Sequence, residues 1–149
     1  MPILELDLAH ILTLFARIGA AFLFSLPLAW ERERHSRLIG LRTFPVVAVA
    51  SCGYVLIAAP IVSGTPDAQA RIIQGLMTGI GFIGGGAILK EGANVTGTAT
   101  AASVWAIGAV GAAAGFGRYE VALVIALVSF GVLRFMERLK NDDNAQDDS

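Results

Sequence analysis

Charged residues that could do chemistry gather in the connections between long apolar stretches of this 149-residue chain. Glu31 ends the first stretch, and Glu91 lies between the third and the fourth. Their carboxylate oxygens are ligands that Mg²⁺ prefers, since this ion binds one or two carboxylates and keeps several waters. The alternative is that both acids form interfacial ion pairs with Arg32, Arg42 and Lys90. A metal site and an ion-pair network therefore both stay open.

A second charged group precedes the third apolar stretch. Asp67 and Arg71 are four residues apart, which is the spacing of an ion pair on one helix face. Pro66 in front of them suits the start of a helix, where an aspartate in the first turn is favourable. Arg17 lies well inside the first stretch. Its guanidinium either reaches the nearer membrane interface or turns into the bundle and pairs, with Asp67 as one candidate.

Other chemistries find no support. The chain has no nucleophile–base pair, no metal-ligand spacing and no paired acids typical of a soluble cleft, so we expect no enzyme and no cofactor apart from Mg²⁺ as ligand or substrate. The net charge of −1 gives no basic field that would attract nucleic acid. Cys52 is interpreted as a small apolar packing residue. Residues 79–84 satisfy G-x-G-x-x-G but lie inside an apolar stretch, where no dinucleotide reaches.

The elements that must position these residues are membrane spans. The chain is 55% hydrophobic and 15% charged, and a span needs roughly 20 predominantly apolar residues. The five stretches of about this length are Ile11–Trp30, Phe44–Val62, Ile72–Leu89, Val95–Phe116 and Val121–Phe135. We therefore predict an all-α, polytopic transmembrane helical bundle of about five spans, with the lipid bilayer as its surroundings.

The positive residues predict the orientation of this bundle. Most of the 11 lysines and arginines flank the first connection, the third connection and the C-terminal end, which share one side of a five-span protein. The positive-inside rule places that side in the cytosol and the N-terminus outside. Residues 1–140 are expected to form the membrane domain, and residues 141–149 a disordered acidic tail with four aspartates.

Glycines recur in the third and fourth stretches at small-xxx-small spacing, which lets helix backbones approach closely in lipid. These glycines are Gly75, Gly79, Gly81, Gly85, Gly111 and Gly115. Three interpretations stay open: packing within the bundle, a broken helix that lines a polar pathway, and contacts of a homo-oligomer.

Six short motifs occur in a specific order along the chain. They are E-R at Glu31-Arg32, G-L-R-T at Gly40–Thr43, D-x-x-x-R-I at Asp67–Ile72, G-I-G-F-I-G-x-G at Gly79–Gly86, E-G-x-N-V-x-G at Glu91–Gly97 and T-A-A-S-x-W at Thr100–Trp105. From about Arg17 to Phe116 the chain thereby resembles the membrane domain of the MgtC/SapB family. Many members carry a soluble domain after the last span, whereas this sequence ends in the acidic tail.

The resemblance implies a multi-pass protein of the bacterial inner membrane that acts in divalent-cation (Mg²⁺) homeostasis or transport and in stress adaptation. It equally implies an alternative, a non-transporting regulatory partner of another membrane complex such as the ATP synthase. The functional positions that the motifs carry over are Glu31, Arg32, Gly40, Arg42, Thr43, Asp67, Arg71, Glu91, Asn94 and Gly97.

Overall fold

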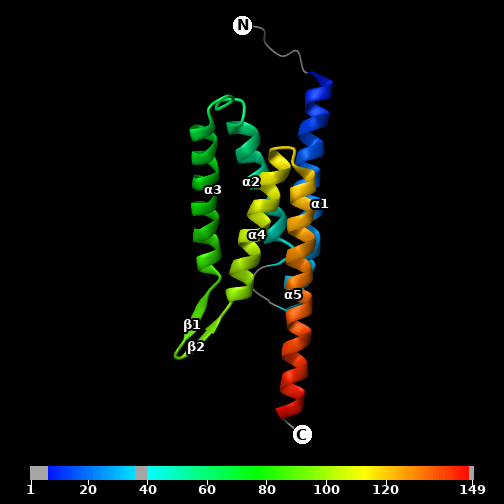
Figure 1. Cartoon of the computed structure of the whole chain (residues 1–149), viewed down its shortest axis with the longest axis vertical. Coiled ribbons are helices and arrows are strands. Elements are labelled where there is room, and N and C mark those ends of the chain that lie inside the picture. The colour runs from blue at the N-terminus through cyan, green and yellow to red at the C-terminus, as the bar shows by residue number, and fades with distance from the viewer. Residues whose placement is uncertain (1–6, 36–39, 148–149) are drawn as a thin grey trace.

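The computed structural model describes residues 7–35 and 40–147. Five helices and one hairpin make up this part of the chain: α1 (Leu8–His35), α2 (Thr43–Ala58), α3 (Pro66–Gly86), β1 (Leu89–Glu91), β2 (Asn94–Thr96), α4 (Thr98–Gly115) and α5 (Tyr119–Asp147). The helices run roughly along one axis, and the hairpin extends from the end of α3 to the start of α4 (Figure 1). The predicted all-α fold is confirmed, and each of the five apolar stretches contributes a helix.

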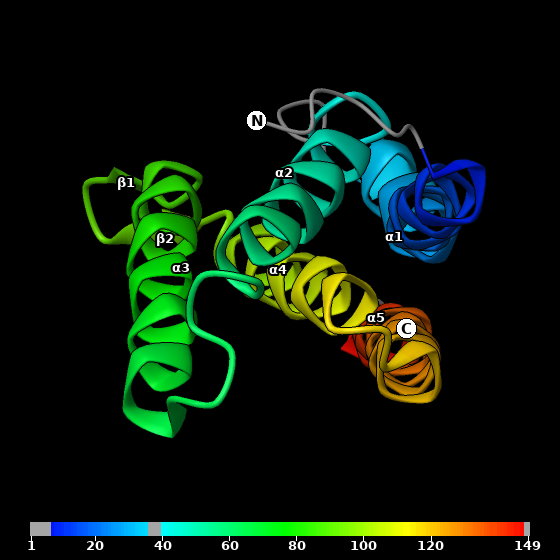
Figure 2. The same cartoon turned by 90° about the horizontal axis from the view of Figure 1, so that it is seen from above.

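Helix α4 is the centre of the bundle. It contacts each of the other four helices, and its most extensive contact is with α2. Figure 2 shows α4 between α3 on one side and α1 and α5 on the other. Helix α3 stands at the edge, where it packs chiefly against α4 and only sparsely against α2. The four helices α1, α2, α4 and α5 therefore form a compact group to which α3 is attached through α4.

Buried apolar side chains fill the middle of this group. Leu28 of α1, Phe44 of α2 and Ile107 of α4 are fully buried, and α3 contributes the buried side chain of Ile80 to the same cluster. Many large apolar side chains face outward instead, among them Phe82, which is 86% exposed. Such a surface would be costly in water but is ordinary where lipid tails surround the protein.

Three helices are long and apolar enough to cross a membrane within the part of the chain that the structure describes. These are α1 over Leu8–Arg34, α4 over Thr98–Gly115 and α5 over Tyr119–Met136. Helix α2 is apolar but only 16 residues long. Helix α3 has 21 residues, but several are glycines and its first turns carry Asp67 and Arg71. Length and composition therefore support membrane spanning most directly for α1, α4 and α5.

Local sequence explains where the helices end. Pro66 occupies the first turn of α3 with Asp67 beside it, which confirms the predicted helix start. The end of α4 is a Schellman motif: the Gly117 amide donates to the Ala114 carbonyl at 2.9 Å and the Arg118 amide to the Ala113 carbonyl at 2.8 Å. Gly117 has φ +74°, the left-handed conformation that this motif requires and that glycine adopts without strain.

Several predicted boundaries were wrong at the ends of spans. The third stretch was expected to run to Leu89 and the fourth to begin at Val95, but both residues lie in the β-hairpin. The physical reason is the two-residue turn of the hairpin, in which Gly92 takes φ +62°. This turn pairs Glu91 with Asn94 across the strands. The second stretch likewise ends as helix at Ala58, before a turn.

Helix α5 continues past the last apolar residues. Its helical backbone reaches Asp147, through most of the segment from residue 141 that composition predicts to be disordered. Arginine, leucine and lysine at 138–140 are good helix formers and favour this continuation. The division of the chain into a membrane domain and a tail at residue 140 stays a prediction.

Candidate functional site

A buried acid lies at the C-terminal end of α1. Glu31 is 1% exposed, and its Oε2 accepts a hydrogen bond from Nη1 of Arg134 on α5 at 3.3 Å. Arg32 beside it is also buried, whereas the Arg134 side chain is 44% exposed. The contact joins residues 103 positions apart and ties the first helix to the last. A charge buried this deeply is costly unless it is paired, and the contact with Arg134 offsets part of that cost for Glu31.

A second carboxylate fixes the start of α2. Oε2 of Glu33 accepts a hydrogen bond from the Leu41 amide at 3.0 Å. Gly40 packs against Glu33 so closely that a Cβ at this position would overlap the carboxylate and lie 3.0 Å from the Glu33 Cα. The Gly40 carbonyl in turn accepts the amides of Thr43 and Phe44 at 3.1 and 3.0 Å. The G-L-R-T motif is therefore a close-packed turn, in which a side chain at the first position would displace the Glu33 carboxylate from its hydrogen bond.

Sequence reasoning did not single out Glu33 as a site residue. The signal that could have found it is its position two residues after Glu31 in a run of alternating acids and arginines, eight residues before Leu41. Arg42, by contrast, precedes α2 as an exposed residue, and Thr43 is the first residue of that helix. These motif positions therefore divide between a buried cluster and an exposed helix start.

The hairpin carries the next group of motif residues. Asn94 is exposed in β2, and the side chain of Glu91 lies outside the described part of the structure. Gly97 has φ +83°, and a Cβ there would overlap the Ala87 carbonyl oxygen, so only glycine fits where α4 begins. Figure 1 shows the hairpin below α3 and α4, and Figure 2 shows it beside α3, on the side of the bundle away from α1.

This arrangement bears on the proposed Mg²⁺ ligands Glu31 and Glu91. The first lies on α1 and the second in β1, and no contact between those two elements is among the main packing contacts. Among the described residues, no group of three or more histidine, cysteine, aspartate or glutamate residues could hold a metal ion. A shared site of these two acids stays a prediction.

Asp67 and Arg71 lie on the first turns of α3, and both are exposed. Neither side chain has an ion pair or hydrogen bond with another described residue. The ion pair expected from their spacing therefore does not form. Exposed pairs contribute only about 0–1 kcal/mol, so spacing alone does not hold two solvated side chains together. Two opposite charges one helical turn apart are thereby left open to other partners.

Arg17 turns into the bundle, as in the second of the two predicted arrangements, but its partner is a main-chain carbonyl and not Asp67. Its Nη1 donates to the carbonyl oxygen of Gly115, the last residue of α4, at 2.9 Å. Nε of the same side chain is buried without a hydrogen-bond partner among the described residues. The guanidinium therefore caps the C-terminal end of α4, where the helix dipole favours a positive charge.

The glycines separate into two groups. A Cβ at Gly111 would come within 2.9 Å of the Ala48 Cα, and one at Gly115 within 2.9 Å of the Cys52 carbonyl oxygen, so both lie at the contact of α4 with α2. A Cβ at Gly75, Gly79 or Gly85 of α3 would meet nothing within 4 Å. Gly81 is intermediate, since a Cβ there would lie 3.6 Å from the Trp105 ring nitrogen. Helix α3 is continuous through Gly86, so the structure contains no break at these glycines.

Two contacting glycines escaped the sequence analysis. At Gly84 a Cβ would lie 3.3 Å from the Ala101 carbonyl oxygen, and at Gly108 it would overlap the Ile80 side chain. These positions hold α3 against α4. Gly84 has an isoleucine four residues before it and another four residues after it, so small-xxx-small spacing does not mark this contacting position.

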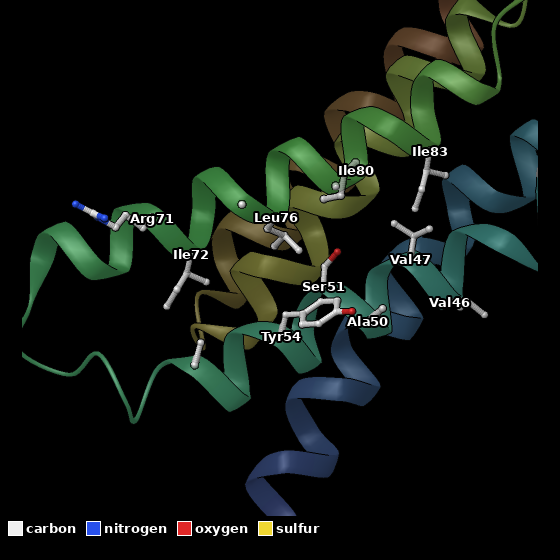
Figure 3. A pocket seen from close by; sticks show the side chains of 13 residues that line it. Val46, Val47, Ala50, Ser51, Tyr54, Arg71, Ile72, Leu76, Ile80 and Ile83 are labelled. Carbon is white, nitrogen blue, oxygen red and sulfur yellow. The ribbon is translucent and has the colours of Figure 1, made fainter.

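An apolar groove separates α2 from α3 between Arg71 and Ile83. Its volume is about 560 Å³, and Figure 3 shows Ala50 and Tyr54 of α2 facing Ile72 and Leu76 of α3 across it. The side chain of Arg71 leaves the groove at one end, with its guanidinium directed away from α2. The open glycines Gly75 and Gly79 belong to the wall of this groove.

A bundle with an apolar outer surface and long apolar helices is a helical membrane protein. Comparison with known proteins shows to which family of membrane proteins the chain belongs. A model of the MgtC family matches residues 18–142, and the chain belongs to that family.

The curated relatives agree. The chain is 35% identical over 109 residues to Protein MgtC of Salmonella typhimurium, and this match covers 73% of the chain and 46% of the relative. It is 38% identical over 117 residues to Protein MgtC of Brucella abortus, covering 78% and 48%. The chain thus spans about half the length of the curated relatives it matches. No solved structure matches it.

Proposed function

We propose that this protein acts in divalent-cation (Mg²⁺) homeostasis, as a multi-pass protein of the bacterial inner membrane without catalytic activity. Membership of the MgtC family supports this role at the level of the family. The observation that carries it in this chain is the buried carboxylate of Glu31 at the end of an apolar bundle.

The chemistry of that carboxylate suits the role. Oxygen ligands are those that Mg²⁺ takes, and one carboxylate with retained waters is an ordinary protein ligand set for this ion. The partner Arg134 is nearly half exposed and lies near the end of the apolar span Tyr119–Met136, so the proposal places an aqueous border beside the pair although Glu31 itself is buried. A cation that reaches the pair competes with Arg134 for the carboxylate, and this competition couples ion binding to the contact between α1 and α5.

Growth at low Mg²⁺ tests the proposal in a strain that depends on this protein. Glu31→Gln keeps the shape of the side chain and removes its charge, and we expect it to abolish growth at low Mg²⁺. Glu120→Gln is the matched control, because Glu120 is an exposed acid paired with Arg118 away from the proposed site. The amount of each variant in the membrane is measured alongside. Normal growth of Glu31→Gln at equal membrane levels would contradict the proposal.

A second candidate function is that of a non-transporting regulatory partner of another membrane complex, such as the ATP synthase. The packing of the core favours it, since glycines bring α2 and α4 into direct backbone contact and leave no space between them. Helix α3 meanwhile presents exposed apolar side chains at the edge of the bundle, which suits a contact with another membrane protein.

Flux and co-purification distinguish the two candidates. Mg²⁺ entry into proteoliposomes of the purified chain, lost in Glu31→Gln and Glu91→Gln, would support transport. Folded protein without flux, together with a membrane complex recovered in fixed ratio after gentle extraction, would support the regulatory partner.

A further inference from the structure

The groove between α2 and α3 has a composition that few proteins leave exposed. Of the residues that line it, only Ser51, Tyr54 and Arg71 carry polar side chains. Its volume of about 560 Å³ falls in the range of ordinary ligand pockets, about 300–1,000 Å³. Water is disfavoured in so apolar a space, and within a bilayer the groove adjoins lipid rather than solvent. The occupant is therefore apolar over most of its length.

The dimensions of the groove favour an acyl chain over a helix. From Arg71 to Ile83 the α3 wall is about 18 Å long at 1.5 Å per residue, close to half of a hydrocarbon core of about 30 Å. A helix of that length, about 10 Å across with its side chains, occupies roughly 1,400 Å³. The whole empty space of the groove, counted out to its open side, is about 1,110 Å³ and falls short of that volume. A single lipid tail of one leaflet matches the length of the groove.

The charges at its end specify a head group. Arg71 projects from the end of the groove, and Asp67 lies one helical turn nearer the start of α3. The two side chains are exposed and have no hydrogen bond or ion pair with a described residue. The arginine complements a phosphate, and the aspartate complements an ammonium group. A phosphate linked to a primary amine presents both groups a short distance apart.

We propose that this groove binds a phospholipid with a phosphoethanolamine head group, its tail lying between α2 and α3, its phosphate on Arg71 and its ammonium on Asp67. The lipid holds α3 to α2 over the length where the two helices make few direct contacts. This site is separate from Glu31 and does not depend on the proposed role in cation homeostasis.

Filling the groove tests the position of the tail. A Cβ at Gly79 meets nothing within 4 Å, and Gly79 lines the groove, so Gly79→Leu places its side chain in the path of the lipid. Gly85→Leu is the matched control, because Gly85 is equally open on the same helix but does not line the groove. Full-length protein is extracted gently from membranes that contain phosphatidylethanolamine, phosphatidylglycerol and phosphatidylcholine. Retained lipid per chain is then counted by native mass spectrometry.

We expect one phosphatidylethanolamine per chain in the wild type and in Gly85→Leu, and none in Gly79→Leu. Equal retention by the two leucine variants would overturn the tail position. Oligomers that the wild type and Gly85→Leu form and Gly79→Leu loses, with no lipid in any of them, would show that a second copy fills the groove instead.

The charge variants test the head group. Arg71→Gln and Asp67→Asn should each weaken retention of phosphatidylethanolamine about tenfold, the effect of one lost charge-assisted hydrogen bond. Asp67→Asn should also remove the preference for phosphatidylethanolamine over phosphatidylglycerol and phosphatidylcholine, since only the first offers a primary amine to the aspartate. Arg118→Gln is the control, as an exposed arginine that is already paired with Glu120. A wild type that retains the three lipids equally would overturn the head-group assignment.

Discussion

Replacing Gly111 by alanine tests the central contact of the bundle, between α4 and α2. The added Cβ would overlap the Ala48 carbonyl oxygen and lie 2.9 Å from both the Cα and the carbonyl carbon of Ala48, whereas ordinary contacts begin at 3.4 Å. The obstacle is backbone, so no side-chain rotation relieves it, and α2 must move outward by about 1 Å. A gap of that size already forfeits a quarter to a half of the dispersion attraction of the atoms concerned.

The expected loss of stability is obtained by comparing Gly111→Ala with a matched variant. Overpacking of this kind costs about 1–3 kcal/mol, whereas alanine favours a helix over glycine by about 1 kcal/mol. Gly131→Ala in α5 receives the same helix benefit, but its Cβ meets nothing within 4 Å. The difference between the two variants removes the common benefit, and we expect Gly111→Ala to be less stable than Gly131→Ala by about 1–3 kcal/mol.

The assay is reversible unfolding of the full chain by sodium dodecyl sulfate in mixed micelles, followed by circular dichroism. If Gly111→Ala is too unstable to purify, its steady-state level in membranes relative to Gly131→Ala gives the same comparison. Equal stability of the two variants would refute the reasoning, because it would mean that α2 and α4 do not meet at Gly111.

Three further predictions concern other contacts of the bundle. Arg17→Gln removes the hydrogen bond to Gly115 and should lower the free energy of unfolding by about 1–2 kcal/mol in the same titration; an unchanged value would mean that the cap is not formed. Gly97→Ala should cost at least about 1–2 kcal/mol, from its positive φ and its overlap with the Ala87 carbonyl, measured as a lower thermal midpoint. Cys52 is fully buried, so a membrane-permeant maleimide should label it only as fast as the protein unfolds; rapid labelling of the folded protein would contradict the packing described here.

Local chemistry made parts of this fold predictable. The five apolar stretches became helices, and Pro66 with Asp67 marked the start of α3 because both residues act within their own first turn. Close helix contacts were signalled by glycine spacing, but only Gly111 and Gly115 of the regular pairs lie at a backbone contact with α2. Spacing reports which residues share a face and carries no information on which neighbour that face meets.

The charged groups were harder to predict for the same reason. The partner of Glu31 is 103 residues away, and no local pattern links it to Arg134. Arg17 was expected to seek a carboxylate or the membrane interface, whereas it binds a main-chain carbonyl at a helix end. Every helix offers such carbonyls, and only the assembled fold decides which of them lies at the depth of a given arginine.

The central position of α4 has a consequence for biosynthesis. Helix α2 leaves the ribosome early, but its main partner is α4, which is made only after α3 and the hairpin. A nascent chain that ends before residue 98 therefore lacks the helix that touches all the others, and its first three helices have only the α1–α2 contact and a sparse α2–α3 contact to hold them together. Most of the contacts between helices can form only once α4 and α5 have left the translocon, so most of the stability is acquired late in synthesis.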